Sequence, residues 1–528
     1  MNNKSISKVE NLIVDNFKLE YTEVSDVPKK LNKLRSNFYN MEKLSNINYR
    51  KTQLINFKKG IEAYKKEILR SNYLDLGLED FSTEFNTLYP ILSDIDYIIN
   101  NFELWSKPQK VDTPLLLAPA SSYMIPEAYG VCTIFSAWNS QYLTLLQPIA
   151  AAIAAGNCVL AKPSEMAPYS AVLLKYILSY IDSDIIDIVQ GGADQCIELT
   201  KNKSDFIIFT GSPVKGVLVA TAAAKYLTPC ILELGGQNPV IVDQDADIKC
   251  VAYNLVNGRF IISGQACISP EYVFVHKEII DKVCNALKDT TELMFGKDAK
   301  CSKDYSRIIN EWHSNRLSDL LSNHKGQIIV SSGSVDVKEK FIPPTIIKYN
   351  TIEEMKHSEL SKEEIFGPIL YLAPYDKLTD CIEYINSKEK PLAMYYFGYN
   401  NKNKDMLIKR TSSGSFVVND TLVQFVNHNL PFGGVGNSGH SAYHGKHGFF
   451  NLSHMKPVMD RSSKVLTLRY PPFTNSKVSI MKKAFITGNL TQNSVYKFFL
   501  YLSIFVFLYI FRSNFINASK AFISNKIQ

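Results

Sequence analysis

One cysteine in this chain stands where a thiol could do chemistry. Cys267 follows Gly-Gln-Ala at the end of an apolar run, and a strand-like segment, 272–276, comes directly after it. The thiolate form of cysteine is a strong nucleophile that can form covalent intermediates. A free cysteine is, however, more often an inert, buried small hydrophobe. The residue by itself leaves both interpretations open.

Polar residues fall at the ends of strand-like segments upstream of this cysteine. Segments such as VCTIFSA, NCVLAK, DFIIFTGS and PCILELGG alternate with helical stretches such as TLLQPIAAAIAAG and VKGVLVATAAAKYL. This alternation is typical of a parallel, doubly wound sheet, where ligands bind beyond the carboxyl ends of the strands. The residues at those ends are Asn139, Lys162, Glu165, Gly211 and Glu233.

Other regions provide the remaining elements. Residues 29–105 repeat apolar positions every three or four residues, which predicts amphipathic surface helices. The Pro-rich stretch 105–124 predicts an extended connector with a strand at its centre. A second α/β region runs from about residue 238 to 420, with strands expected at YVFVH, GQIIVSS, PILYLAP, LAMYYFG and SGSFVVN. At 528 residues the chain exceeds one hydrophobic core, so at least two domains are expected.

The net charge of +7 belongs to the C-terminal end. Seven of the 58 basic residues lie in 476–528, where no acidic residue occurs, so the rest of the chain carries 51 residues of each sign. A neutral body predicts no nucleic-acid partner. The nine cysteines are dispersed without a CxxC pair, which favours reduced thiols and predicts no metal site. The first 25 residues contain no apolar run of signal-peptide length, so we expect no export signal.

Seven motifs follow one another along the chain: AWN (137–139), KPSE (162–165), FTGS (209–212), LELGG (232–236), GQAC (264–267), EEIFGP (363–368) and PFGGVGNSG (431–439). In this order they resemble the aldehyde dehydrogenases. The stretches WSKPQKVDTP and AYHGKHGF, with an apolar tail, resemble the class 3, fatty-aldehyde branch in particular. The resemblance implies an α/β, aldehyde dehydrogenase-type fold, with a Rossmann-like NAD-binding domain, an α/β catalytic domain and a small bridging β element.

The resemblance also predicts how the chain divides into domains and segments. They are an N-terminal tail over 1–25, an NAD-binding domain over 26–233 with 110–125 contributing to the bridging element, a catalytic domain over 234–425, a closing segment with a bridging strand over 426–475, and a basic tail over 476–528.

The resemblance gives three residues catalytic roles. Cys267 would be the nucleophile that adds to an aldehyde carbonyl, and Glu233 the general base that activates water to hydrolyse the thioester. Asn139 would donate to the developing oxyanion together with the backbone N–H of Cys267. The alternatives are a strand-end surface glutamate for Glu233 and an Asx turn or helix cap for Asn139.

The same resemblance implies an NAD site, with NADP also possible. Lys162 and Glu165 would contact the adenosine ribose, although KPSE also fits a capping box. A carboxylate on the ribose would repel a 2′-phosphate and favour NAD. Gly211, Ser212 and Gly216 are expected beside the pyrophosphate, and Gly235 would leave room for the backbone close to the cofactor. Glu364 and Phe366 are expected at the nicotinamide half. Asn419 and Phe432 would line the substrate cleft, or would serve only core packing.

Two positions depart from the family pattern. An aromatic residue and a proline usually follow the oxyanion asparagine, whereas this chain has Ser140 and Gln141. A lysine often follows LELGG, where this chain has Gln237. We expect Ser140 and Gln141 to change the orientation of the Asn139 side chain or the shape of the substrate entrance. We expect Gln237 to leave turnover intact.

The C-terminal stretch 495–511 is the most apolar stretch of the chain, with Lys497 near one end. As a helix it would span roughly 25 Å, a little less than the ~30 Å hydrocarbon core, and Lys497 could snorkel. We expect a C-terminal transmembrane anchor over 495–511. A core helix and an in-plane interfacial helix are the alternatives.

The resemblance implies NAD(P)-dependent oxidation of an aldehyde to its acid through a thiohemiacetal and a thioester, and together with the apolar tail it favours a medium- or long-chain aldehyde, with aromatic aldehydes left open. It also implies a homodimer, with 112–124 and a strand around 465–468 in its interface. The protein would face the cytosol from the endoplasmic reticulum, the mitochondrial outer membrane or a lipid droplet. A CoA-acylating dehydrogenase and an inactive, membrane-anchored binding protein of the same fold are the other candidates.

Overall fold

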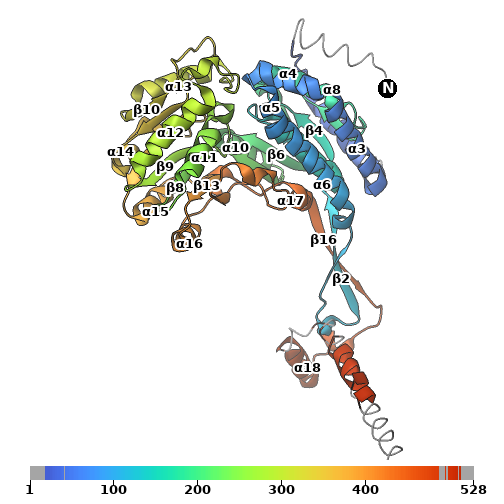
Figure 1. The fold of residues 1–528 in the computed structure, drawn as a ribbon. Coiled ribbons are helices and arrows are strands. Elements are labelled where there is room, and N and C mark those ends of the chain that lie inside the picture. Colours follow the sequence, from blue (N-terminus) through green and yellow to red (C-terminus); the bar gives the residue numbers. More distant parts are fainter. Residues whose placement is uncertain are drawn as a thin grey trace, which may run out of the picture. The chain divides into compact units, whose positions relative to one another are not determined.

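A computed structural model describes residues 18–40, 42–486, 491, 494, 497–508 and 510–512 of the chain. These residues divide into two compact units. One comprises the chain up to Trp105 and from Ala128 to His454, and the other comprises Ser106–Glu127 and the chain from Met455 onward. The first unit contains two large sheets (Figure 1).

The first sheet has six strands, five of them parallel. Its strands, in spatial order, are β15 (Gly439–His440), β7 (Cys230–Leu234), β6 (Phe206–Gly211), β3 (Val131–Phe135), β4 (Cys158–Lys162) and β5 (Ile186–Ile188). Only β15 runs antiparallel to its neighbour. The strand expectations for this region are confirmed. The short edge strand β15 was not anticipated, because two residues in a Gly-rich segment carry no alternation.

Helices supply the buried partners of this sheet. They are α2 (Val27–Asn40), α3 (Ile47–Ala63), α4 (Lys65–Leu76), α6 (Tyr89–Trp105), α7 (Gln141–Ala155), α8 (Pro168–Leu178), α9 (Ala193–Lys201), α10 (Pro213–Ala224) and α17 (Gly445–Asn451). The short helix α5 (Asp80–Thr83) lies between α4 and α6 in the chain. Every residue of β3 and β4 is buried, as expected for parallel strands covered on both faces. All residues of α7 except Leu143 are buried as well, which explains its largely apolar sequence.

The second sheet has seven strands. In spatial order they are β10 (Gln327–Ser331), β11 (Thr345–Lys348), β12 (Ile369–Tyr375), β9 (Pro270–His276), β8 (Asn238–Val242), β13 (Ala393–Phe397) and β14 (Ser415–Val418). The five strands expected from the sequence are present. The sequence interpretation missed β8 and β11, which are only five and four residues long and adjoin proline.

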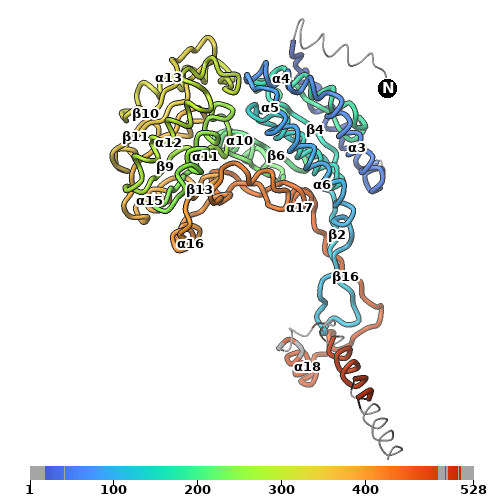
Figure 2. The backbone as a smooth tube through the Cα atoms, in the orientation of Figure 1, coloured from blue at the N-terminus to red at the C-terminus, as the bar shows by residue number. Residues whose placement is uncertain are grey.

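Alternate residues of these strands enter two separate cores. Val240, Val273 and Tyr395 pack with helices α11 (Ile248–Phe260) and α12 (Ile280–Phe295) on one face. Ile241 and Phe274 pack on the other face. The helices on that face are α13 (Glu311–Asn323), α14 (Ile352–Lys356), α15 (Leu378–Asn386) and α16 (Asn401–Arg410). The backbone trace shows α11 and α12 beside β9 (Figure 2).

The second unit contains a three-stranded sheet in the order β1 (Gln109–Val111), β2 (Ala120–Ala128), β16 (Ser453–Arg461), and helix α18 (Asn475–Ile486). Two expectations were wrong here. The centre of the 105–124 connector is a 3-10 turn, Leu115–Leu117, between two strands. Residues 467–469 also form a 3-10 turn, and the strand lies earlier, at β16. Pro114 and Pro119 enclose the first turn, and Pro471 and Pro472 follow the second, so neither short apolar run continues as a regular strand.

The expected anchor over 495–511 lies partly outside the described residues. Residues 497–508 are helical. Within the part of the chain that the structure describes, no helix is both long enough and apolar enough to cross a membrane.

Candidate active site

A cleft of about 1350 Å³ opens in the first unit, and Cys267, Glu233 and Asn139 all line it. Asn139 follows β3, and Glu233 is the second-to-last residue of β7. Both therefore lie at the carboxyl end of the strands of the first sheet. Cys267 lies in the loop between α11 and β9 of the second sheet's region. Three residues that are distant in the sequence therefore share one cavity, and ligand clefts of enzymes concentrate such polar groups.

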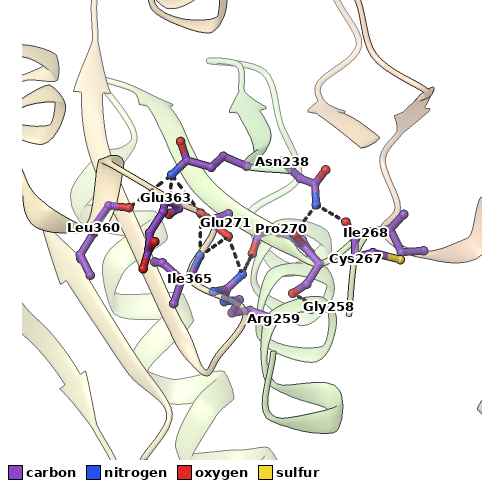
Figure 3. A network of polar contacts seen from close by, with 12 residues as sticks. Asn238, Gly258, Arg259, Cys267, Ile268, Pro270, Glu271, Leu360, Glu363 and Ile365 are labelled. Atoms are coloured by element: carbon purple, nitrogen blue, oxygen red, sulfur yellow. Dashed lines mark hydrogen bonds and ion pairs between the residues drawn. The ribbon is translucent and has the colours of Figure 1, made fainter. Parts of the chain in front are cut away.

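The backbone carbonyls of the Cys267 loop are held by side chains behind the loop. Asn238 Nδ2 donates to the carbonyl oxygens of Cys267 at 2.8 Å and Ser269 at 2.9 Å. The Tyr395 hydroxyl donates to the carbonyl of Ile268 at 2.5 Å. Figure 3 shows Asn238 directed at this turn. Because Asn238 and Tyr395 stand in strands of the second sheet, these hydrogen bonds hold the loop against that sheet.

The approach to this loop contains unusual backbone conformations. Ile262 and Ser263 have φ of 50° and 48°, and Gly264 has φ of 71°. A β-branched residue rarely adopts the left-handed region, so Ile262 is strained. Such strain is concentrated at functional sites, and here it turns the chain sharply just before the cysteine.

Glu233 is a buried carboxyl without a partner. Its side chain is 2% exposed, and neither oxygen has a hydrogen-bond partner among the described residues. Burial raises the pKa of Glu233 well above its ordinary value. The surface-glutamate alternative was therefore wrong. A desolvated carboxyl of this kind is suited to accept a proton near neutral pH.

Burial also raises the pKa of the Cys267 thiol, with further contributions from the carboxyls of Glu233 and Glu364. The thiol itself is half-buried at the cleft wall. Without a ligand the group is therefore a thiol, and a positive charge or a proton acceptor beside it would be needed to form the thiolate.

Asn139 is buried, and its Nδ2 donates to the carbonyl of Gln265 at 2.8 Å. One of its two amide hydrogens is thus used to fix the side chain against the cysteine loop, and the other is left for the cleft. Helix α7 is capped by Ser140 rather than by Asn139, so the capping alternative is wrong.

The departure at Gln141 has a structural explanation. The buried Gln141 side chain accepts from the Ser164 N–H at 2.7 Å and donates to the Ala167 carbonyl at 3.0 Å. These two bonds tie the start of α7 to the KPSE turn. The chain therefore replaces a proline-fixed turn after Asn139 by a hydrogen-bonded one.

Lys162 and Glu165 are close to each other at the end of β4. Lys162 is buried, its Nζ lies 3.6 Å from Glu165 Oε2, and it also donates to the Pro163 carbonyl at 2.6 Å. Glu165 lines the cleft, whereas Lys162 lies behind its surface. Helix α8 begins only at Pro168 with Ala167 as its N-cap, so KPSE does not form a capping box.

Helix α10 approaches the cleft with its N-terminus. Gly211 and Ser212 line the cavity, and the hydroxyl of the N-cap Ser212 makes no capping bond. Gly216 lies one turn further, where a Cβ would come within 2.7 Å of the Leu234 side chain. Glycine at this position therefore lets α10 pack closely on β7. A helix N-terminus held in this way favours a phosphate group.

Glu364 and Phe366 line the opposite wall. A Cβ on Gly235 would overlap the Glu364 carboxylate, so this glycine makes room for it. Burial and the neighbouring Glu271 raise the pKa of Glu364 to about 8. Phe366 has φ of 45° and packs edge-on against Trp138, with 5.4 Å between ring centroids.

The two expected substrate residues differ in outcome. Phe432 lines the cleft and stacks on His444, with 5.5 Å between the rings. Asn419 does not line it, because its amide donates to the Gly398 carbonyl and accepts from the Gly398 N–H. Leu422 and Phe425 from the same segment line the cleft instead.

Sequence reasoning missed several residues of this cleft. Tyr443, buried and close to both Cys267 and Glu233, lines it together with His444. Both belong to AYHGKHGF, so the motif was a signal without an assigned role. Trp138 also lines the cleft, and its place in the AWN motif, next to Asn139, was a signal for it. Ile262 carried no signal, because an isoleucine in the left-handed region cannot be read from sequence.

A doubly wound sheet whose carboxyl edge faces a cleft lined by a thiol, a buried carboxyl and an amide is the arrangement expected of an α/β enzyme with its site at that edge. The family model described as the aldehyde dehydrogenase family matches residues 15–458. The chain is 37% identical over 452 residues to aldehyde dehydrogenase family 3 member A2 of Rattus norvegicus, covering 84% of this chain and 92% of the relative.

Two further comparisons agree. The 4,4'-diaponeurosporen-aldehyde dehydrogenase of Staphylococcus aureus is 36% identical over 441 residues, 83% of this chain and 94% of that protein. A solved structure titled as the substrate-bound state of Staphylococcus aureus AldH has a TM-score of 0.83 at 34% identity, covering 87% of this chain and 99% of the other.

The chain belongs to the aldehyde dehydrogenase family and is similar to its family 3 members. It is an enzyme, an oxidoreductase that acts on aldehydes and uses NAD or NADP. The expected class of fold and of reaction is confirmed, and the inactive binding protein is disfavoured.

Proposed function

We propose that this enzyme oxidises apolar aldehydes, aliphatic of medium or long chain or aromatic, to carboxylic acids, with Cys267 as nucleophile, Glu233 as general base and Asn139 as oxyanion donor. The observation that carries the proposal is that a thiol, an unpartnered buried carboxyl and an amide donor line one cleft. Each group has the chemistry that one step of the reaction requires.

In the first step the Cys267 sulfur would bond to the carbonyl carbon of the aldehyde. The thiol proton passes to solvent water, and the π electron pair of the carbonyl moves onto its oxygen, which becomes an oxyanion. The free amide hydrogen of Asn139 and the Cys267 N–H would donate to this oxygen, and such donors stabilise it more than the flat carbonyl. The tetrahedral carbon then carries the hydride that must leave to give the thioester.

Glu233 would act in the second half of the reaction. Its carboxylate takes a proton from a water molecule, the resulting hydroxide adds to the thioester carbon, and the carbon–sulfur bond breaks to release the acid and the thiol. Burial without hydrogen bonds raises the pKa of Glu233, which makes its carboxylate a stronger base than an exposed one. Transfer to CoA would not require such a base, so hydrolysis is the favoured outcome.

The residues present fit a dinucleotide. Gly211 and Ser212 at the start of α10 suit the pyrophosphate, Glu165 suits the adenosine ribose, and Glu364 with Phe366 suits the nicotinamide half. When bound, the oxidised cofactor accepts the hydride and places a positive charge near the thiol. Glu165 would repel a 2′-phosphate, so we propose a preference for NAD.

The substrate assignment is supported by the apolar residues near the nucleophile. Trp138, Leu143, Leu422, Phe425 and Phe432 line the cleft. An aldehyde with an aliphatic or aromatic body would bury its apolar surface there, at about 25 cal/mol per Å² removed from water.

The test is NADH formation by the full-length protein with hexanal, hexadecanal and benzaldehyde, beside Cys267→Ser and Glu233→Gln. We expect Cys267→Ser to abolish turnover and Glu233→Gln to stop after one equivalent of NADH per subunit. A Cys267→Ser variant that still turns over would refute the assignment of the nucleophile. Full activity of Glu233→Gln, or acyl-CoA as the main product when CoA is supplied, would refute hydrolysis by Glu233.

The C-terminal residues support a proposal of membrane association. Phe498, Phe505 and Phe511 are 63%, 68% and 66% exposed, and the basic residues Lys497 and Arg512 lie at the two ends of this stretch. Aromatic and basic residues in this arrangement are typical of a membrane interface. Flotation of the full-length chain with phospholipid vesicles, compared with a chain ending before residue 494, tests it. Equal flotation of the two would overturn the proposal.

A further inference from the structure

A buried ion pair lies beneath the Cys267 loop, and neither partner belongs to the cleft. Arg259 is 1% exposed and Glu271 is 1% exposed, with 3.6 Å between Arg259 Nη1 and Glu271 Oε2. Arg259 Nη1 also donates to the Pro270 carbonyl at 2.9 Å. Two of the guanidinium nitrogens have no hydrogen-bond partner in the described chain. A buried pair that is incompletely satisfied is a poor source of stability, so another role must be considered.

Glu271 connects the nucleophile loop with the opposite wall of the cleft. Four residues after Cys267, its carboxylate accepts from the Ile365 N–H, which lies 3.2 Å from each of its oxygens. Figure 3 shows Ile365 beside Glu271. In the chain Ile365 stands between Glu364 and Phe366, the two residues that line that wall. A single carboxylate therefore holds the turn 363–367 from within, at the point between its two functional side chains.

Gln237 extends the same connection. Its Nε2 lies 3.1 Å from Glu271 Oε1 and 2.9 Å from the Glu363 carbonyl, to both of which it donates, and its Oε1 accepts from Lys388 Nζ at 3.1 Å. The position that departs from the family's lysine is thus part of this network, and Lys388 brings an ammonium group to it. The Gln237 amide therefore links the Glu271 carboxylate to the 363–367 turn through a second set of hydrogen bonds.

The two loops also touch through their backbones. A Cβ on Gly264 would overlap the carbonyl oxygen of Gly367, so only a glycine allows the nucleophile loop this close to the turn. The separation between Cys267 and the 364–366 wall is therefore set by a backbone contact on one side and by Glu271 on the other.

We propose that Glu271 is a positioning residue that fixes the 363–367 turn relative to the Cys267 loop, and so sets the distance over which the hydride leaves the substrate carbon. The inference rests on the proposed roles of Cys267, Glu364 and Phe366. It assigns no contact between Glu271 and substrate or cofactor.

The distinguishing measurement is a ratio of two activities of the full-length enzyme. One is NAD-dependent oxidation of hexanal, which needs the nucleophile and the 364–366 wall. The other is hydrolysis of p-nitrophenyl acetate without NAD, which would need Cys267 and Glu233 but not that wall. In Glu271→Gln, we expect oxidation to fall by up to about 100-fold, since misplacement by about 1 Å is enough for this. Ester hydrolysis should change by no more than about threefold. Glu271→Asp should restore part of the oxidation, because it keeps the charge.

Loss of Glu271 leaves Arg259 as an unpaired buried charge, so folding needs its own control. The double variant Arg259→Met with Glu271→Gln removes that charge and should show the same fall in the ratio. Asp75→Asn serves as a matched control, because Asp75 is a buried carboxylate outside the cleft that accepts from the N–H groups of Tyr169 and Ser170. It should lower stability without changing the ratio.

An unchanged ratio in Glu271→Gln and in the double variant would overturn the proposal and leave Glu271 a purely structural residue. A ratio that also falls in Asp75→Asn would do the same, since lost stability would then explain it. Failure of the proposed function itself would be seen in a different variant. If Cys267→Ser retained either hexanal oxidation or ester hydrolysis, Cys267 would not be the nucleophile.

Discussion

Gly235 offers a test of how the cleft wall is built, because its substitution should act through one neighbour. A Cβ at this position would overlap the Glu364 carboxylate and lie 2.7 Å from its Cδ. Real Cβ atoms essentially never approach a heavy atom within 3.0 Å, so the carboxylate must move away. The matched control is Gly236→Ala, whose Cβ would have its closest neighbour, the Pro391 Cα, at 3.2 Å.

The size of the effect follows from what Glu364 would contribute. The comparison is made at about pH 9, because burial raises the pKa of Glu364 to about 8 and the group is charged above that value. A hydrogen bond to a charged group is worth about 1.5–3 kcal/mol, and about 1.4 kcal/mol corresponds to a tenfold change. If Gly235→Ala displaces the carboxylate from the cofactor ribose, kcat/KM for NAD should fall by about 10- to 150-fold. Gly236→Ala should lose no more than about threefold, because a neighbour has to give by only a few tenths of an ångström.

The assay is initial-rate NADH formation at saturating hexanal with varied NAD, for Gly235→Ala, Glu364→Gln and the double variant. Since both single changes remove the same contact, the double variant should be no worse than the poorer single one. Multiplicative losses in the double variant, or equal losses in Gly235→Ala and Gly236→Ala, would refute the reasoning.

Three further outcomes are expected. Asn139→Ala should lower kcat by about 10²- to 10³-fold, because one oxyanion donor is lost, and NAD binding measured by tryptophan fluorescence should stay unchanged; near-normal kcat would contradict the role. His444 is 2% exposed, and burial lowers its pKa to about 4, so the folded state binds fewer protons than the unfolded state between pH 6.5 and 4. Its contribution to stability is therefore complete above pH 6.5 and is lost as the pH falls to 4, by up to about 3 kcal/mol in all. His444→Gln should flatten the fall in urea-unfolding free energy between pH 7.5 and 4.5, and an unchanged pH slope would count against the assignment. Gly264→Ala and Gly296→Ala both place a side chain at positive φ, but only the first overlaps another backbone, so Gly264→Ala should lower the urea midpoint further and reduce activity, whereas Gly296→Ala should lose about 1 kcal/mol of stability alone. Equal losses of stability with full activity in both would show that the contact with Gly367 is unimportant.

The regular elements could be predicted from the sequence where the local pattern is long. Apolar runs of five or more residues, such as Val131–Phe135, are buried on both faces of a sheet and read directly as strands. Assignment failed at Leu115–Leu117 and Thr467–Arg469, where three-residue turns form in proline-rich or irregular chain. At such lengths local preference is weak, and tertiary contacts decide the conformation.

The candidate site likewise contains residues that the sequence predicted correctly and one that it did not. Motif order identified Cys267, Glu233 and Asn139, and all three line the cleft. Asn419 was assigned to the substrate cleft by its position near the family's motifs, yet its amide pairs with Gly398. A side chain's direction depends on the backbone conformation at that residue, here a φ of 55°, which the motif does not contain.

The sequence by itself determined the family, the α/β class and the candidate nucleophile, because these depend on short motifs and on apolar periodicity that each segment carries alone. Only the tertiary structure decided that Glu233 is a buried carboxyl without a partner and that Glu271 joins the two walls of the cleft. The physical reason is that burial and hydrogen bonding are made by residues far apart in the chain. Ile365 lies 94 positions from Glu271, and no local pattern encodes that contact.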